Sequence, residues 1–398
     1  MLTLQILFWI SVLVVIHVYL GYPVGIYLKS RSQQDGAREE PPDEQLPTLT
    51  VLIPAYNEEA GLARKLENTL ALYYPQHRLQ VIVASDGSSD RTVEIAGQYA
   101  DRGVQVSHSS ERRGKMETLN RTVPMATGDI ILVTDARAEL SRDTLRWIAR
   151  HFQDPKVGCV SGSRVCLATE SVASEGEGLY WRYESWIKQA ESRLGTCLGA
   201  DGQVMAVRKS LFPNIPDCND DFYVPMNILM TTSYKVRYEP RAKAWITSAS
   251  SLRGEWQRKI RTNVLFFRNL PYLRMVLDPR KSTIWWRFLS HHMLRRLVPF
   301  AMASSLFLSL LLWNAGTLYR VITLVQCLFY MAAGAGLVAE RYGIRFRILY
   351  VPFYFVFANA AVLLAWMYCF QGRTYSIWSR TERILPHSPP PSNMTKPV

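Results

Sequence analysis

Three runs of aliphatic and β-branched residues each end in acidic side chains, and these acids are the residues best placed to do chemistry. The runs with their acids span Val51–Glu59, Val81–Asp90 and Ile130–Glu139. Parallel strands deliver the side chains at their carboxyl ends to one edge of a sheet, where ligands bind in open α/β folds. The acids therefore indicate a ligand site at such an edge. The third run is unusual because Arg137 follows Asp135 by two residues, where a second metal-binding acid is expected.

The elements that must position these acids alternate between buried strands and amphipathic helices from Thr48 to about Trp245. Strands are expected over Thr48–Ile53, Leu79–Ala84, Val104–His108, Ile130–Thr134 and Val204–Val207. Helices are expected over Glu58–Leu72, Asp90–Ala100 and Lys115–Ala126. Asn57 could cap the first of these helices, and Asp90 the second. This alternation predicts a βαβ-type sheet in a single soluble domain.

The chain has 398 residues and a formal net charge of +13, which fits either a nucleic-acid-binding protein or a membrane protein with basic flanks. Hydropathy favours the membrane. Four long apolar stretches lie at Leu4–Leu20, Leu294–Trp313, Leu318–Ala339 and Ile348–Phe370. Each is close to the roughly 20 residues that span a bilayer as a helix. A signal peptide is the alternative for the first stretch, but it lacks a basic start and a small-x-small cleavage site.

The basic residues around these stretches predict a multi-pass protein of the cell (inner) membrane. Lys29 and Arg31 follow the first stretch, which places the amino terminus outside and the central domain in the cytoplasm. The same count places Arg341 inside but Arg373 outside, which the positive-inside rule disfavours. Either the tail is tolerated outside, or one stretch is re-entrant.

Composition divides the chain into six segments. They are an N-terminal transmembrane anchor at 1–28, a linker at 29–47, the sheet domain at 48–248, basic amphipathic interfacial helices at 249–292, three transmembrane helices at 293–370 and a tail at 371–398. Within the interfacial segment, Arg253–Asn269 interleaves cations with aromatic residues, as helices at a membrane surface do. A helix that binds a nucleic-acid groove is the alternative, and the four apolar stretches argue against it.

Six motifs in order resemble those of the membrane-embedded family 2 glycosyltransferases, which include cellulose, chitin and hyaluronan synthases and exopolysaccharide transferases. The motifs are YNEE at 56–59, SDGSSD at 85–90, GK at 114–115 with Asn120 downstream, TDA at 134–136, NDDF at 219–222 and RKIR at 258–261. The resemblance implies a GT-A-like fold, that is, a cytosolic α/β domain with a Rossmann-like mixed sheet, joined to about four transmembrane helices. It implies a nucleotide-sugar donor, expected to be a UDP-sugar, and a glycan or lipid-linked acceptor. Polysaccharide-export partners are possible, and nucleic acid is not a partner.

The family resemblance places Tyr56, Glu58 and Asp86 around the nucleoside of the donor. A carboxylate at a strand end, such as Asp86, can accept hydrogen bonds from the base or the ribose. The alternative is that residues 85–90 form only a turn before a helix, because Asp, Gly and Ser favour turns. Lys115 follows Gly114 at a predicted helix start, where backbone N–H groups and a cation together suit a phosphate. A solvated surface lysine is the alternative there.

The diphosphate of such a donor is expected to be held by Asp135 through a divalent metal, Mg²⁺ or Mn²⁺, since these ions prefer oxygen ligands. The family pattern is acid-x-acid, and Arg137 stands at the second acid position. One hypothesis is that Arg137 supplies positive charge next to the diphosphate. Arg258 and Arg261 resemble the family's diphosphate-binding cations, and a spacing of three lets one helical face present both. Thr262 stands where the family has Trp, which weakens the case for a processive polymerase.

The general base is expected within the NDDF motif, since an acceptor hydroxyl needs a carboxylate within hydrogen-bond reach. The resemblance favours Asp221, with Asp220 as a neighbour that raises its pKa. A helix cap is the alternative, and it suits Asn219 better than two successive acids. Gly199–Gln203 resembles the family segment around the transferred sugar, with a plain turn as the alternative.

Two functions follow. The first is a membrane-bound inverting glycosyltransferase with Asp221 as base, either a polysaccharide synthase or a single-sugar transferase. The second is a catalytically degenerate subunit that binds nucleotide or scaffolds a polysaccharide secretion complex. Arg137 is the feature that supports the second function, whereas Asp86, Lys115 and Asp221 argue for the first.

Overall fold

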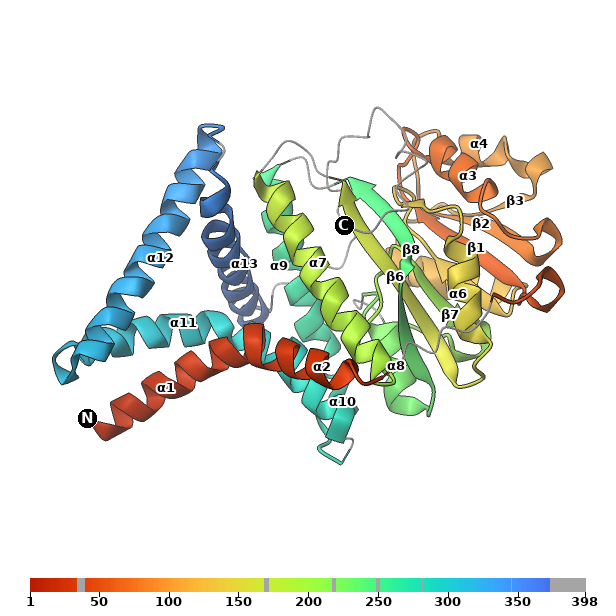
Figure 1. Ribbon diagram of the computed structural model, residues 1–398. Helices are drawn as coiled ribbons and strands as arrows, with labels where there is room; N and C mark the ends of the chain where they lie inside the picture. The colour runs from red at the N-terminus through yellow and green to blue at the C-terminus, as the bar shows by residue number, and fades with distance from the viewer. Residues whose placement is uncertain are drawn as a thin grey trace.

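The structure is a computed structural model that describes residues 1–33, 40–167, 172–216, 220–247, 251–280, 282–344 and 346–372. Asn219 and the tail beyond 372 therefore lie outside the described residues, as does part of the expected linker. A sheet domain forms one end of the molecule and long apolar helices form the other (Figure 1). The helices α7 (Val172–Arg193) and α9 (Leu252–Asn269) lie between these two parts.

One mixed sheet of eight strands, in the order β3-β2-β1-β4-β7-β6-β8-β5, forms the centre of the domain. The strands are β1 (Leu49–Ala55), β2 (Leu79–Asp86), β3 (Val104–Ser109), β4 (Ile130–Val133), β5 (Glu139–Leu140), β6 (Val157–Leu167), β7 (Met205–Arg208) and β8 (Lys235–Thr247). The first four strands in spatial order are parallel, and β7 runs antiparallel to β4 and β6. The mixed α/β sheet expected from the sequence is confirmed.

Helices cover both faces of this sheet, which explains why β1 and β4 are buried along their whole length. One face packs against α3 (Leu62–Leu70), α4 (Thr92–Gly97) and α6 (Thr144–Phe152). The other face packs against α5 (Lys115–Thr122) and α8 (Tyr223–Thr231), and α9 joins the same apolar cluster through Phe266. Because β1, β2, β3 and β4 are parallel, their carboxyl ends meet at one edge, as the acid-tipped runs predict.

The first helix begins later than the sequence indicates, and Asn57 does not cap it. α3 starts at Leu62 rather than at Glu58, and its N-cap is Gly61. Asn57 instead adopts a left-handed backbone conformation, with φ at 51°. Its side-chain oxygen accepts the backbone N–H of Ser89 at 2.9 Å, so Asn57 ties the loop after β1 to the loop after β2. Asp90 does accept the N–H of Thr92 at the start of α4, at 3.0 Å.

Four helical segments in the described chain are long and apolar enough to cross a membrane. They are Leu2–Ser30, Thr283–Leu311, Thr317–Arg341 and Ile348–Phe370. The first comprises α1 (Leu2–Ile16), the π-helical turn η1 (His17–Gly21) and α2 (Tyr22–Ser30). The second comprises most of α10 (Ser282–Arg287), the π-helical turn η8 (Phe288–Met293) and α11 (Leu294–Leu311), while α12 (Thr317–Arg341) and α13 (Arg347–Phe370) form the rest. The four expected stretches are confirmed by length and composition, and their orientation in the membrane stays a prediction.

The basic segment of the sequence forms α9, which packs directly on a membrane helix. Ile260 and Val264 of α9 contact Ala361 and Ala365 of α13. This contact fixes the sheet domain to the membrane helices through the last helix before the second apolar segment. Three cations of α9, Arg258, Lys259 and Arg261, line the cavity described next.

Candidate functional site

A cavity of about 900 Å³ opens at the carboxyl edge of the sheet and reaches the membrane helices. Its wall contains a residue from nearly every predicted motif. These are Tyr56, Glu58, Lys115, Asp135, Arg137, Asp220, Asp221, Arg258 and Arg261. Residues that are up to 205 positions apart in the sequence (Tyr56 to Arg261) thus share one space. The spatial convergence of separate motifs on one large concave site indicates a ligand-binding or active site.

Lys115 lies between two carboxylates in the wall of this cavity. Its ammonium donates to Asp135 Oδ1 and to Asp221 Oδ2, both at 2.9 Å. Burial alone lowers the pKa of a lysine, but Asp135 and then Asp221 outweigh burial and raise the pKa of Lys115. The lysine therefore stays charged at neutral pH. Gly114 allows this position because its φ of 96° starts α5 in a conformation that other residues rarely adopt.

Asp221 keeps one oxygen free at the start of α8. Its Oδ2 accepts from Lys115, whereas its Oδ1 is buried and has no hydrogen-bond partner among the described residues. Burial raises the pKa of Asp221, and Lys115 opposes that rise. A side chain at position 202 would overlap Asp221 Oδ2, so Gly202 is required for this placement. The arrangement can accept a proton at Oδ1 while Oδ2 stays bound to a cation.

Asp220 has a different environment although it is adjacent. Its Oδ1 accepts from the side-chain amide of Asn269 at 2.7 Å and from the backbone N–H of Phe222 at 3.2 Å. Burial and then the charge of Asp221 raise the pKa of Asp220 to about 6. Asp220 therefore joins the start of α8 to the end of α9, and Asp221 is the acid with an oxygen that has no hydrogen-bond partner among the described residues.

Arg137 pairs with Glu58 rather than standing alone. The Nε of Arg137 lies 3.0 Å from Glu58 Oε1 and 2.7 Å from Glu58 Oε2, and both side chains are largely buried. At the position where the family pattern has its second acid, this chain therefore has Arg137, and Glu58 of the YNEE motif compensates its charge. Beside this pair, the guanidinium of Arg112 stacks on the ring of Tyr56 at 3.7 Å, a cation–π contact.

Two motif residues lie behind the cavity wall. Asp86 is buried and is not among the residues that line the cavity. Its two oxygens accept the backbone N–H groups of Arg113 and Gly114, each at 2.8 Å. Asn120 exchanges two hydrogen bonds with the backbone of Ile215, at 2.7 and 2.8 Å. Both side chains therefore hold loops in place here, and direct contact of Asp86 with a nucleoside stays a prediction.

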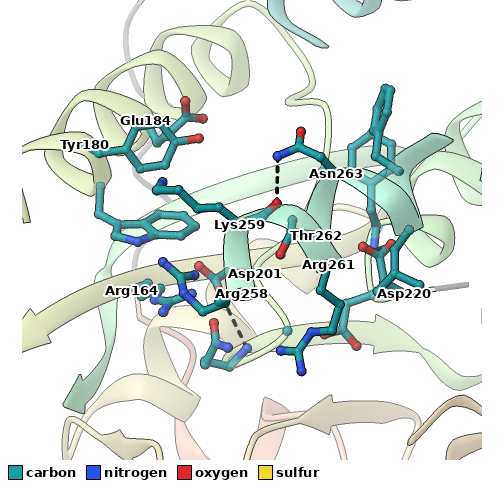
Figure 2. A pocket seen from close by; sticks show the side chains of 18 of the residues that line it. Arg164, Tyr180, Glu184, Asp201, Asp220, Arg258, Lys259, Arg261, Thr262 and Asn263 are labelled. Carbon is teal, nitrogen blue, oxygen red and sulfur yellow. Dashed lines mark hydrogen bonds between the residues drawn. The ribbon is translucent and has the colours of Figure 1, made fainter. Parts of the chain in front are cut away.

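The cations of α9 form a buried ion-pair network along the same cavity (Figure 2). Arg258 donates to Glu255 and to Glu177 of α7, each at 2.8 Å, and Arg164 of β6 also pairs with Glu177 at 3.2 Å. Lys259 lies 3.5 Å from Glu255. Burial disfavours the charge of Glu255, yet Arg258 and Lys259 lower its pKa to about 2. Arg258 is thus held by acids, and its contact with a diphosphate stays a prediction.

Arg261 and Thr262 line the cavity one helical turn further along α9 (Figure 2). Arg261 therefore lies where the RKIR motif predicts a cation. Thr262 confirms that the cavity wall has a small polar side chain where the family pattern has Trp. Their direct contact with a ligand stays a prediction.

Oxygen atoms that could hold a divalent metal gather around Lys115. Asp135 Oδ2 accepts from the amide nitrogen of Gln203 at 2.9 Å, which turns Gln203 Oε1 away from that carboxylate. Gln203 Oε1, like Asp221 Oδ1, is buried without a hydrogen-bond partner among the described residues. Among the described residues, no group of three or more His, Cys, Asp or Glu side chains is arranged to hold a metal ion. The donor atoms fit Mg²⁺ or Mn²⁺ in type, with Asp135 as the expected carboxylate ligand.

Several residues of this region were not identified from the sequence. Gln203 is one, and Lys65 is another: it is buried on α3 and donates to Thr134 Oγ1 at 2.9 Å and to the Ala138 carbonyl at 2.6 Å. Burial lowers the pKa of Lys65 to about 7 against the opposing effect of Asp135. Lys65 fixes both ends of the loop that carries Asp135. Lys65 precedes the buried Leu66 on an amphipathic helix, and this position was the sequence signal that could have indicated that Lys65 is buried.

Helix α7 contributes a group of buried acids that was not predicted from the sequence. Three buried glutamates, Glu177, Glu184 and Glu191, follow one another at intervals of seven residues and so lie along one face. Glu184 and Glu191 bind His291 of η8 from either side, at 3.2 and 2.9 Å. The heptad spacing was a signal in the sequence, because it places all three acids on one side of a helix.

Comparison with known proteins finds similarity in the sheet domain. The family model described as Glycosyl transferase family 2 matches residues 50–214. A poly-beta-1,6-N-acetyl-D-glucosamine synthase of Staphylococcus aureus is 26% identical over 226 residues, which are 55% of this chain and 54% of that protein. A beta-monoglucosyldiacylglycerol synthase of Trichormus variabilis is 30% identical over 181 residues, which are 44% of this chain and 39% of that protein. The chain thus spans about half the length of the curated relatives it matches.

A solved structure resembles the whole fold. It is a mannosyltransferase from Pyrobaculum calidifontis in complex with GDP-Man and Mn²⁺, with a TM-score of 0.67 and 22% sequence identity. The alignment covers 92% of this chain and 99% of that one, so it includes membrane helices as well as the sheet. At this identity the likeness establishes the fold, and it confirms the fold class expected from the sequence.

Proposed function

We propose that this chain, whose residues 50–214 match the family model described as Glycosyl transferase family 2, is an inverting glycosyltransferase that uses a nucleotide-sugar donor at a membrane. The observation that carries the proposal is the Lys115 bridge. It joins Asp135, the expected metal ligand, to Asp221, the expected base, and leaves Asp221 Oδ1 without a hydrogen-bond partner among the described residues. Lys115, whose positive charge can stabilise a leaving diphosphate, and Asp221, which can accept a proton, are therefore joined by a hydrogen bond.

The donor is assigned to the part of the cavity between the loops after β1 and β4. Tyr56 and Glu58 line the nucleoside end, and Asp86 supports it through the backbone of Arg113 and Gly114. The diphosphate then lies near Lys115 and Arg261. Bound at Asp135, a divalent ion would neutralise charge on the diphosphate as the nucleotide leaves.

The chemical step follows from the two oxygens of Asp221. An acceptor hydroxyl gives its proton to Oδ1 while its oxygen forms a bond to the anomeric carbon. The bond between that carbon and the diphosphate oxygen breaks, and the electron pair leaves with the nucleoside diphosphate. Because attack and departure occur on opposite sides, the configuration inverts. Lys115 binds Oδ2 throughout and so orients Oδ1 towards the acceptor.

The donor sugar and the acceptor are part of the proposal, with a UDP-sugar as the expected donor. The relatives differ in what their names state: one is a synthase of a poly-N-acetylglucosamine and the other of a glucosyl diacylglycerol. The similar solved structure holds GDP-Man and Mn²⁺. A screen must therefore include UDP- and GDP-sugars. Polysaccharide-export partners and a cytoplasmic active site in the inner membrane are further expectations from the family resemblance.

A second candidate is a catalytically degenerate, nucleotide-binding or scaffolding subunit, which Arg137 at the second acid position favours. The ion pair of Arg137 with Glu58 weakens this second candidate, because Glu58 compensates the charge that Arg137 brings to the position of the second acid. The bridge between Lys115, Asp135 and Asp221 would also have no use in a scaffold.

The test uses the purified full-length chain in lipid nanodiscs. UDP- and GDP-sugars are supplied with Mg²⁺ or Mn²⁺ and, separately, with a chelator, and released nucleotide and labelled product are measured. We expect release from one donor, and loss of transfer in Asp221→Asn with donor binding unchanged by calorimetry. Transfer that persists in Asp221→Asn would overturn the assignment of the base. Donor binding without any nucleotide release would favour the second candidate.

A further inference from the structure

We infer that His292, which lies in the second membrane segment, is a positioning residue for the transfer reaction. It holds the segment of residues 199–203 against Asp221 through the carbonyl of Leu198, the residue before that segment. The inference rests on the proposed function, since it takes Asp221 as the base, and it gives a part in the reaction to a residue outside the sheet motifs. His292 acts on the protein backbone and not on a substrate.

Residues 199–203 form the part of the cavity wall that touches both Asp135 and Asp221. All five residues line the cavity. A side chain at position 202 would overlap Asp221 Oδ2, so the backbone of the segment passes directly beside the proposed base. At the end of the segment, the amide nitrogen of Gln203 donates to Asp135 Oδ2 at 2.9 Å. A shift of this segment would therefore change the position of the base relative to the expected metal ligand.

Both backbone polar groups of Leu198 are bound to side chains that lead into the membrane segments. Its N–H donates to Glu191 Oε2 at 3.0 Å, and its carbonyl accepts from His292 Nε2 at 3.2 Å. A carbonyl can only accept, so Nε2 of His292 carries a proton in this contact. Glu191 is held in turn by Tyr22 of α2 at 2.5 Å and by His291 of η8 at 2.9 Å. The first two membrane segments thus fix Leu198 from two directions.

The imidazole of His292 is oriented by the rings around it. Its centroid lies 5.0 Å from the ring of Phe222 and 5.7 Å from that of Phe288, and it stacks on His291 at 4.5 Å. Such packing restricts rotation of the ring and keeps Nε2 directed at the carbonyl. Phe222 directly follows Asp221 in the chain. One side chain therefore contacts both the residue next to the base and the backbone that leads to the segment beside the base.

A second residue of the same membrane segment holds the chain further upstream. Arg287 is buried, and its guanidinium donates to the carbonyls of Glu191 and Leu194, each at 3.2 Å, and to that of Thr196. Arg287 immediately precedes the π-helical turn η8, and His292 lies within it. The i→i+5 bonding of a π-helix gives a wider turn than that of an α-helix, which places residues four and five positions apart on one side. One side of this membrane segment therefore holds the connection that follows α7.

Positioning and simple bracing can be distinguished by what the loss of one N–H donor does. Polar side chains in membrane segments are costly and commonly mark a functional site, but a brace would make the same hydrogen bonds. A brace predicts a lower unfolding midpoint with unchanged catalysis. Positioning predicts a lower kcat at an unchanged donor KM, since Tyr56 and Glu58, at the proposed nucleoside end of the cavity, lie on another loop.

Two variants of His292 separate its N–H from its ring. His292→Phe keeps a ring to pack on Phe222 but has no N–H donor, whereas His292→Gln can donate from its amide nitrogen but has no ring. In nanodiscs with the donor found above, we expect His292→Phe to lower kcat about tenfold and to change the donor KM by less than about twofold, since small displacements of reacting groups slow the chemical step. His292→Gln should retain most of kcat. The opposite order of the two variants, an equal loss in both, or a wild-type kcat in His292→Phe would overturn the inference.

His17 of η1 supplies the matched control. It contacts Ser290 of η8 at 3.0 Å, and it does not line the cavity. His17→Phe removes a hydrogen bond between the same two membrane segments, so it should lower the thermal unfolding midpoint about as much as His292→Phe and leave kcat near that of the wild type. A kcat as low as that of His292→Phe would indicate general loosening of the membrane segments and overturn the specific role of His292. If His292→Phe does not fold, His292→Met, which also lacks an N–H donor, takes its place with the same expected result.

Hydrogen exchange provides a measurement that does not depend on turnover. The backbone N–H groups of Leu198 and Asp201 donate to Glu191 Oε2 and Ser161 Oγ, each at 3.0 Å, so they report on the position of this stretch. Without donor, peptides that cover residues 198–203 should exchange several-fold faster in His292→Phe than in His292→Gln or in the control variant. Equal exchange in the three variants would overturn the hold of His292 on the segment.

Failure of the inference and failure of the proposed function give different results. If the wild type releases nucleotide from no donor, the proposed function falls, while the exchange rates still decide whether His292 holds the segment. If the wild type releases nucleotide and His292→Phe matches it in both kcat and exchange, the glycosyltransferase assignment stands and the inference falls.

Discussion

Lys115 and Arg258 each lie between two carboxylates in the wall of the same cavity, yet the two clusters differ in what they leave open. Around Lys115, the same ammonium pairs with both Asp135 and Asp221, and Asp221 Oδ1 has no hydrogen-bond partner among the described residues. Around Arg258, three cations serve two acids, since Arg164 and Lys259 also pair with Glu177 and Glu255. We call these the Lys115 cluster and the Arg258 cluster.

The pKa values of their acids shift in opposite directions. Burial raises the pKa of Asp221 in the Lys115 cluster despite the nearby lysine. In the Arg258 cluster burial acts in the same sense, but the cations outweigh it and lower the pKa of Glu177, and that of Glu255 to about 2. A raised pKa makes a carboxylate a better proton acceptor, whereas an acid with a lowered pKa stays ionised. The two clusters thus differ in the direction in which the pKa values of their acids shift, and we expect the Lys115 cluster to take part in the reaction and the Arg258 cluster to act as a structural brace.

Removing the cation of the Lys115 cluster should have the largest effect on activity. We expect Lys115→Gln to lower kcat about 10²- to 10³-fold, because an electrostatic contact to the leaving group is lost and the base loses its orienting partner. Steady-state nucleotide release and lipid or glycan labelling measure it, and the thermal unfolding midpoint serves as the control for folding. A kcat within a few fold of wild type would show that the Lys115 cluster is also only a brace.

The matched change in the Arg258 cluster should act on stability instead. Arg258→Gln leaves Glu177 and Glu255 with less positive charge in a buried setting, which costs about 3–5 kcal/mol when one partner of a buried pair is removed. Thermal unfolding in nanodiscs should report a lower midpoint, while donor KM in the folded fraction changes less than in Lys115→Gln. An unchanged thermal unfolding midpoint together with a large rise in the KM for the donor would instead support the prediction that Arg258 binds the diphosphate.

The same contrast explains how much could be predicted from the sequence. The acid-tipped strands and the apolar membrane segments were predicted correctly, because burial and hydrogen bonding within a strand or a helix depend on local periodicity. Asp221 was singled out through its motif; one of its oxygens has no hydrogen-bond partner among the described residues, and its role as the base stays a prediction. The predicted start of α3 was wrong. Asn57, the expected cap, instead accepts a hydrogen bond from the backbone N–H of Ser89 in another loop.

The acids of α7 could not be interpreted from local patterns. Glu177 is bound by Arg258, which is 81 positions away, and Glu191 by Tyr22, which is 169 positions away. A buried glutamate is tolerated only with such partners, so its burial is decided by tertiary structure rather than by its neighbours in the chain. For the same reason the motif of Arg258 predicted a ligand contact, whereas the structure gives it protein partners.

Asp220 sharpens the comparison because it is a second acid with a raised pKa beside Asp221. Its folded-state pKa of about 6 lies above the ordinary value of 3.8, so the folded state favours the protonated form. The stability that this protonation supplies is present at low pH and is lost as the pH rises through about 6. Asp220→Asn should therefore stabilise the protein by about 1–2 kcal/mol at pH 8 and by less at pH 5. Thermal unfolding at the two pH values measures this, with activity largely retained. A loss of transfer equal to that of Asp221→Asn would instead make Asp220 a catalytic acid.

The smallest effect is expected at Arg137, which forms an ion pair with Glu58. Glu58 compensates the charge of Arg137, so less of that charge is available to a diphosphate than the charge of Lys115. We expect Arg137→Ala to lower donor turnover only about two- to fivefold at equal metal concentration, which is the range of one screened charge contact. Glu58→Gln should add little to it, because both changes break the same pair and their effects are not additive. Turnover equal to wild type in Arg137→Ala would remove Arg137 from the donor site and leave its pair with Glu58 as a link between the loops after β1 and β4. A loss as large as that of Lys115→Gln would mean that a nucleotide releases Arg137 from Glu58 when it binds.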